Sequence, residues 1–254
     1  ANRFIENYSK TFHFTTDKHR GNTTINGISV NFDTANFEIT EENPDLLKVN
    51  LIAPLKPKDS VKISITYAVK IPNDKFTRYG VSDLEYNLRY WYLTPAIFDT
   101  KWRLYNNLDL DDLYVDYTDY NISFKVPKEY EITSDLTGSY FVKDSINSYG
   151  LSGKKRFDIE LNISKTNNFT NYTFDGKTIL SDIASKGLNE ELKSSILKRE
   201  FYFIQTFLGK YPHDKIVLSQ LEYDKNPVYG FNQLPSFLAA MLKLLTPQSF
   251  EILS

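Results

Sequence analysis

Short β-rich runs separated by turn residues fill roughly the first 165 residues, and this pattern limits the possible folds more than any other feature of the chain. No helical periodicity interrupts these runs, so a set of strands is predicted. Seven or more strands without intervening helices are typical of a β-sandwich. The predicted strands are Thr11–Thr16, Ile25–Phe32, Leu46–Ile52, Val61–Ile71, Leu84–Leu93, Trp102–Tyr105, Leu113–Val126 and Phe157–Ile163, and the turns between them include Asn26-Gly27, Asn43-Pro44-Asp45, Lys56-Pro57-Lys58-Asp59 and Pro72-Asn73-Asp74.

The composition is sufficient to fill such a sandwich. Aromatic residues make up 15% of the chain, with 18 Tyr and 18 Phe, and each ring buries a large apolar area. The segment Val61–Tyr67 is the clearest half-buried strand, because its apolar residues alternate with polar ones. Val61, Ile63, Ile65 and Tyr67 are therefore expected to face the core.

Charge and hydropathy exclude several classes of partner. The 30 Lys and Arg nearly balance the 32 Asp and Glu, so no overall field favours nucleic acid or an anionic membrane. No apolar run approaches the ~18–20 residues of a membrane-spanning helix. With no cysteine there is no disulfide, thiolate metal site or cysteine nucleophile. The first residue is Ala1 instead of Met, so we expect a processed or trimmed start. A periplasmic, cell-envelope or secreted location is favoured.

A helix followed by a strand is predicted beyond the polar segment 167–187. Asn189 is the predicted N-cap, Gly209 the predicted stop, and Lys215–Leu221 has the character of a strand. We place a junction at 165–175, which gives two domains, 1–170 and 171–254. The apolar residues at helical spacing are Leu192, Ile196, Phe203, Phe207 and Leu208.

The last residues continue this alternation of helix and strand. Asp224–Pro227 interrupts the strand, and Val228–Leu234 is a second extended run. Phe237–Leu245 reads as a short apolar helix, after which Thr246-Pro247 opens another helix. The chain ends inside that helix, so a fragment is predicted.

These residues resemble the M1 family of zinc aminopeptidases at the start of their catalytic domain. The resemblance rests on a helix ending in F-x-G-x-Y-P (207–212), then a strand, a loop and G-x-x-x-x-P (230–235). It implies a mainly β fold, in which a saddle-like N-terminal β-sandwich is followed by the α+β beginning of a thermolysin-like domain. It also implies that Gly230, Phe231, Asn232 and Gln233 form a substrate-binding strand. Gln233 stands where the family has a glutamate that holds the substrate's α-amino group, so amine binding is expected to be weaker.

The zinc motif of that family is absent from these 254 residues. None of the histidines, His13, His19 and His213, belongs to an H-E-x-x-H motif. We therefore expect no catalytic residue, no metal ligand and no cofactor in this chain, and no activity of the chain alone. The resemblance implies zinc, a peptide substrate and the rest of a catalytic domain in the full-length protein.

Several alternatives remain open. A pseudo-peptidase with the same fold would explain Gln233, and a self-contained sugar-binding or adhesion module would require exposed, coplanar rings at Tyr90, Trp91 and Tyr92. The acidic cluster from Asp109 to Asp119 either binds a cation or forms a solvated turn and an edge strand. Glu222 is expected to form a structural ion pair.

Overall fold

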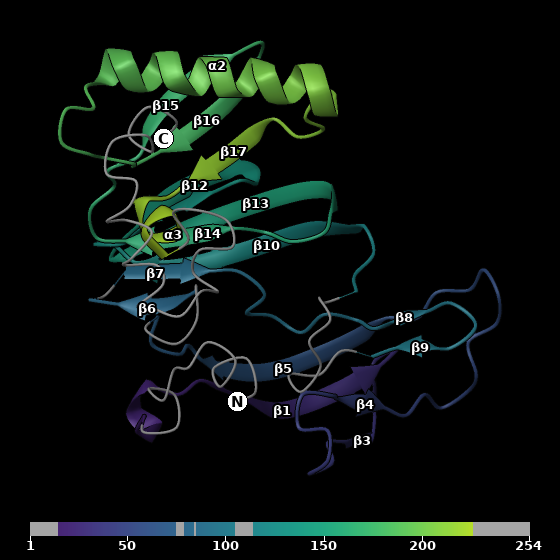
Figure 1. Ribbon diagram of the computed structural model, residues 1–254. Helices are drawn as coiled ribbons and strands as arrows, with labels where there is room; N and C mark the ends of the chain where they lie inside the picture. Colours follow the sequence, from purple (N-terminus) through teal and green to yellow (C-terminus); the bar gives the residue numbers. More distant parts are fainter. Residues whose placement is uncertain (1–14, 75–78, 84, 105–113, 226–254) are drawn as a thin grey trace, which may run out of the picture. The chain divides into compact units, whose positions relative to one another are not determined.

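A computed structural model describes residues 15–74, 79–83, 85–104 and 114–225, and these residues are mainly β (Figure 1). Their contacts group into two compact units. Unit 1 comprises residues 1–76 and 90–116, and unit 2 comprises residues 77–89 and 117–254. The division into domains 1–170 and 171–254 stays a prediction, although these two units divide the first of those segments.

Unit 1 contains a three-stranded sheet and two short strand pairs. The sheet has the order β2-β1-β5, and Ile28, Val30 and Ala35 form the centre of its core. The elements are η1 (Asp17–His19), β1 (Asn22–Val30), β2 (Asp33–Thr34), β3 (Phe37–Glu38), β4 (Lys48–Val49), β5 (Ile63–Lys70), β8 (Ile97–Phe98) and β9 (Trp102–Arg103).

One predicted turn of unit 1 is wrong. Asn26-Gly27 lies inside β1, where the register with β5 shifts between Ile25 and Gly27. An extra residue in one strand of an antiparallel pair forms a β-bulge, and glycine is common there. The strand signal of β5 is confirmed. Of the residues predicted to face the core, Val61, Ile65 and Tyr67 are half-buried, whereas Ile63 is exposed.

Unit 2 contains a three-stranded sheet of order β10-β13-β12 and a four-stranded sheet of order β11-β14-β7-β6. Leu136, Ile159 and Leu161 are fully buried among them. The strands are β6 (Gly80–Ser82), β7 (Glu85–Leu88), β10 (Thr118–Pro127), β11 (Glu131–Ser134), β12 (Thr137–Lys143), β13 (Ile146–Arg156) and β14 (Leu161–Ser164).

The hairpin of β12 and β13 was not predicted from the sequence. Asp144 adopts a positive φ of 55° in the two-residue turn between these strands, as tight hairpin turns require. Gly138 allows the two backbones to approach closely, because a Cβ on it would lie 2.0 Å from the Gly150 carbonyl oxygen. The many Ser, Gly and Lys residues of this hairpin conceal its strand character.

Unit 2 also contains a third sheet with one long helix beside it (Figure 1). β15 (Thr170–Phe174) and β16 (Lys177–Ser181) are antiparallel, and β17 (Lys215–Leu218) pairs with β16 in parallel. A parallel neighbour needs a long crossover, which α2 (Glu190–Leu208) provides. The polar segment 167–187 thus holds a hairpin, whose turn is Asp175-Gly176 with both φ angles positive.

The ends of α2 are as predicted, but its buried face is different. The Asn189 side chain accepts a hydrogen bond from the Leu192 backbone N–H at 2.8 Å, and Gly209 ends the helix with φ at 92°. Phe201 packs on Tyr172 and Ile179 of the sheet. Of the residues predicted to form the apolar face, Leu192, Phe203, Phe207 and Leu208 are exposed.

The strand predicted over Lys215–Leu221 stops early. After Leu218 the chain turns into α3 (Gln220–Lys225), whose first turn is capped because the Ser219 hydroxyl accepts a hydrogen bond from the Glu222 N–H at 3.1 Å. The sequence Ser219-Gln220-Leu221-Glu222 has the spacing of a capping box, so a helix start was encoded there.

Candidate functional site

The residues predicted to bind substrate, Gly230, Phe231, Asn232 and Gln233, lie outside the described residues. So do His13 and the acidic residues Asp109, Asp111 and Asp112. His19 ends η1, and His213 lies in the turn before β17, where its ring meets that of Tyr211 edge to face. In the described residues, no group of three or more His, Cys, Asp or Glu side chains could hold a metal ion.

The most unusual chemistry of the described residues is a group of buried and half-buried charges in unit 2, here named the charged cluster. Burying a charge is expensive unless it is paired and hydrogen-bonded, so such groups are rare without a structural or functional reason. Its members come from the ends of β7, β11, β13 and β14 and from α3. They are Arg89, Asp135, Arg156, Asp158, Glu160 and Glu222.

Arg156, the last residue of β13, forms the first ion pair of the cluster. Its guanidinium donates to Asp135 Oδ2 at 2.9 Å and to the Asp135 backbone carbonyl at 3.1 Å. The two side chains are only 7% and 14% exposed. Burial raises the pKa of Asp135, although the Glu160 backbone N–H and Arg156 both act to lower it.

Arg89, directly after β7, joins the second part of the cluster to α3. Its Nε donates to Asp158 Oδ2 at 2.6 Å, and its Nη1 also contacts Glu222 Oε1 at 3.4 Å and the Tyr79 hydroxyl at 3.3 Å. Tyr79 in turn donates to Glu222 Oε1 at 3.1 Å. The structural ion pair expected at Glu222 is therefore present.

Glu160 occupies the centre of the cluster and differs from the other carboxyl groups. Its backbone is fixed, since its N–H donates to Asp135 Oδ1 at 3.0 Å and its carbonyl accepts from the Ser134 hydroxyl at 2.8 Å. Its side chain is only 8% exposed, and Oε1 has no hydrogen-bond partner. Burial first, and then the charge of Glu222, raise the pKa of Glu160 to about 8. This carboxyl is therefore largely protonated at neutral pH.

A row of buried, uncharged polar residues crosses the four-stranded sheet of unit 2. Thr133, Asn162 and Asn87 are direct neighbours across β11, β14 and β7, and all three are buried. Asp135, Glu160 and Arg89 each lie just outside these strands, two positions from Thr133, Asn162 and Asn87 respectively. Asn87 is completely buried, and neither atom of its amide group has a hydrogen-bond partner.

The charged cluster can hold a proton, but it lacks the parts of a hydrolytic site. Each carboxylate near a guanidinium is hydrogen-bonded to it, which fixes geometry and does not activate a nucleophile. The nearby His213 and Lys215 do not form a catalytic pair either. Burial lowers the pKa of each, and Lys215 Nζ donates to the Leu136 carbonyl at 2.9 Å. The cluster is suited to fixing α3 and to responding to pH.

Apart from Glu222, the members of this cluster were not predicted from the sequence. The signal lies in Arg156-Phe157-Asp158-Ile159-Glu160, where charged residues alternate with apolar ones. Such alternation normally indicates a strand with one solvated face. Here Arg156, Asp158 and Glu160 are all buried, which only the strands packed around them could disclose.

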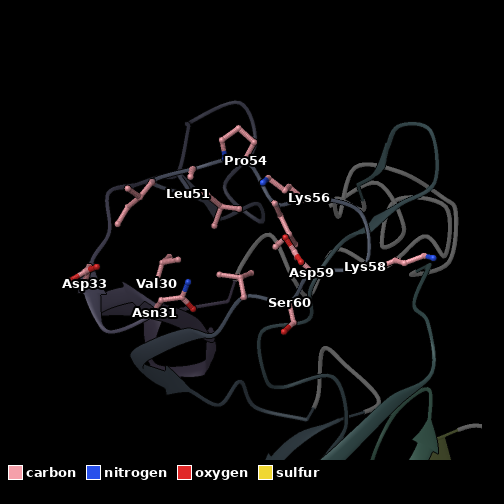
Figure 2. Close-up of a pocket in the computed structure, with 13 residues that line it drawn as sticks. Val30, Asn31, Asp33, Leu51, Pro54, Lys56, Lys58, Asp59 and Ser60 are labelled. Atoms are coloured by element: carbon pink, nitrogen blue, oxygen red, sulfur yellow. The ribbon is translucent and has the colours of Figure 1, made fainter.

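Two other candidate surfaces lie in unit 1. The Trp91 and Tyr92 rings meet at 86°, so they do not form the coplanar platform that a sugar-binding module requires. An open pocket of about 590 Å³ lies between the end of β1 and the loop 51–61 (Figure 2). Figure 2 shows Asp33 and Lys58 at opposite ends of this pocket, so these two charged groups do not converge on one point.

Comparisons with known proteins give a likeness of fold only. No protein-family model and no curated protein matches the chain. Among solved structures it is similar to an M1 zinc metallopeptidase from Deinococcus radiodurans, with 12% identity and a TM-score of 0.49. It is equally similar to a mutant of a two-domain M1 zinc metallopeptidase bound to L-arginine, with 12% identity and a TM-score of 0.49. In both cases the match covers 78% of this chain and 46% of the other, so this chain spans about half the length of those proteins.

Proposed function

We propose that this chain is the N-terminal portion of an M1-like metallopeptidase, which supplies a β-rich scaffold and a substrate-aligning strand but no zinc site. The observation that carries the proposal is the order of elements that the M1 resemblance implied. A capped helix ends at Gly209, the turn at Tyr211-Pro212 follows, and a strand then begins at Lys215. Gly230, Phe231, Asn232 and Gln233 are the residues we assign to the peptide, which would add to them as an extra strand.

The same proposal covers the longer protein. Its partners would be a peptide with a free N-terminus and the remainder of a catalytic domain that holds zinc and hydrolyses the first peptide bond. A domain boundary near residue 170 and a periplasmic, cell-envelope or secreted location belong to the same proposal. No helix among the described residues is long and apolar enough to cross a membrane.

The test is the change of Gln233→Glu in the natural polypeptide that contains this chain. A carboxylate binds an ammonium group more strongly than a neutral amide does, by about 1.4 kcal/mol or tenfold. We expect kcat/KM on peptides with a free amine to rise by roughly this factor. N-acetylated peptides should remain poor substrates. Gln205→Glu introduces the same charge on α2 and serves as the matched control.

An unchanged rate on free-amine peptides would show that position 233 does not meet the amine. The metal content separates the proposal from the pseudo-peptidase alternative. A natural polypeptide that binds peptides but contains no stoichiometric zinc and hydrolyses nothing would support the pseudo-peptidase. Stoichiometric zinc on residues 1–254 alone would contradict the proposed division of labour between this chain and the remainder of the protein.

A further inference from the structure

The attachment of α3 to the rest of unit 2 depends on a few polar contacts. At its start, the Gln220 N–H donates to Asp182 Oδ1 at 2.6 Å, and the Gln220 side chain accepts from the Ala184 N–H at 2.7 Å. Its charged contact is Glu222, which lies between Tyr79 and Arg89. A helix of six residues has little stability of its own, so these contacts determine whether α3 stays in place.

Glu160 belongs to the same charged cluster, and its buried Oε1 has no hydrogen-bond partner among the described residues. Arg89 is the cation that attracts it, but Arg89 already binds Asp158 and Glu222. The carboxylates of Glu222, Asp135 and Asp158 all repel a negative charge on Glu160, and Glu222 does so most strongly. Tyr211 also lies within electrostatic range of Glu160, and it is uncharged at neutral pH.

We propose that α3 docks onto a protonated Glu160, and that loss of this proton to the solvent releases α3 from the sheet of β11, β14, β7 and β6. With Glu160 charged, the cluster holds two carboxylates, Glu160 and Glu222, that repel each other in a poorly hydrated site and are both attracted to Arg89. Movement of α3 away from the site separates Glu222 from Glu160 and lets water reach both groups. The contact is therefore a pH-sensitive latch on the segment that precedes residue 226. This inference does not depend on the proposed peptidase function.

The latch gives a defined pH dependence. Burial and repulsion hold the pKa of Glu160 near 8 when α3 is docked. With α3 released, the group is hydrated and its pKa falls toward the ordinary value of 4.5. Between these two values the docked state binds one more proton than the released state, so the released fraction rises by up to about tenfold per pH unit. Above about pH 8 the dependence levels off.

Amide hydrogen exchange of residues 220 and 222 tests the proposal, because both N–H groups are hydrogen-bonded in the docked state. The readout is the protection factor, which corrects for the intrinsic pH dependence of exchange. We expect protection of these amides to fall by up to about a hundredfold from pH 6 to pH 8 and to change little above that. In Glu160→Gln, which is neutral at every pH, protection should be the same at pH 6 and pH 9.

Two further variants keep the test decisive. Glu222→Gln removes the repelling carboxylate, so the pH dependence should weaken even if Glu160→Gln does not fold. Glu200→Gln removes a carboxylate that is 52% exposed on α2 and should leave the wild-type dependence intact. Protection that is independent of pH in the wild-type protein would overturn the proposal. An unchanged pH dependence in Glu222→Gln or Glu160→Gln would overturn it as well.

Discussion

Two Asp–Arg pairs with the same separation illustrate how differently the two units use charge. In unit 1 Arg103 binds Asp99 at 2.9 Å, and in unit 2 Arg156 binds Asp135 at 2.9 Å. The first pair is 44% and 40% exposed, whereas the second is 7% and 14% exposed. Water screens an exposed pair, while a buried pair has given up its hydration and depends on its partner. The contact distance alone therefore says little about what each pair contributes.

The largest expected effect comes from breaking the buried pair. Arg156→Met leaves Asp135 charged and without its partner in a poorly hydrated site, which should lower the free energy of unfolding by about 3–5 kcal/mol. Urea denaturation, followed through amide signals of each unit, measures this loss. Arg103→Met in unit 1 is the matched control and should leave stability unchanged within error. Equal losses in the two variants would contradict the contrast between the units.

The second effect is a pH dependence of stability, which we expect from the buried Glu160 of unit 2. The pKa of Glu160 is raised from 4.5 to about 8 by burial and by Glu222. A carboxyl with a raised pKa in the folded state contributes stability that is complete below pH 4.5 and is lost as the pH rises to about 8. The slope is at most about 1.4 kcal/mol per pH unit. Unfolding at several pH values in wild type and Glu160→Gln should show this slope only in the wild type.

A smaller effect tests whether the loss of stability depends on the burial of the contact or only on its location in unit 2. Asn189 caps α2 in unit 2, but its hydrogen bond is exposed. Asn189→Ala should lower stability by about 1 kcal/mol, which is typical of a helix cap, and far less than the loss in Arg156→Met. Thermal unfolding monitored by helical circular dichroism measures it. A loss as large as that of Arg156→Met would show that unit 2 is fragile throughout.

The smallest effect concerns the exposed pair itself. Asp99→Asn removes the acceptor charge while keeping the shape of the side chain. Because both partners are substantially exposed, we expect no measurable change in the unfolding midpoint. Between low and high salt, the unfolding midpoint of unit 1 should change no more in the wild-type protein than in Asp99→Asn. A clear salt-dependent loss in Asp99→Asn would mean that this pair is less hydrated than its exposure indicates.

The sequence identified the elements whose signals are local. The cap at Asn189, the stop at Gly209 and the strand beginning at Lys215 depend on residues close together in the chain, and all three are present. The hairpin around Asp175-Gly176 and the capping box at Ser219 carried equally local signals that were not recognised. These features were within reach of sequence reasoning.

The remaining features depend on contacts distant in the chain. β13 is paired on both sides, with β10 and β12, and that pairing overrides its many Ser, Gly and Lys residues. The buried face of α2 is set by the sheet beneath it and not by the helix alone, which is why Phe201 is buried while Phe207 is exposed. The charged cluster is the extreme case, since Arg89 and Asp158 are 69 residues apart.

The most direct test of this account is the titration of Glu160 by carbon NMR of its side-chain carboxyl group. We predict a midpoint well above that of an ordinary glutamate, near pH 8, and a signal that is absent from Glu160→Gln. The carboxyl of the exposed Glu200 provides the internal comparison in the same spectra. A Glu160 midpoint near 4.5 would show that this carboxyl is hydrated and charged at neutral pH, and would contradict both the buried cluster and the latch on α3.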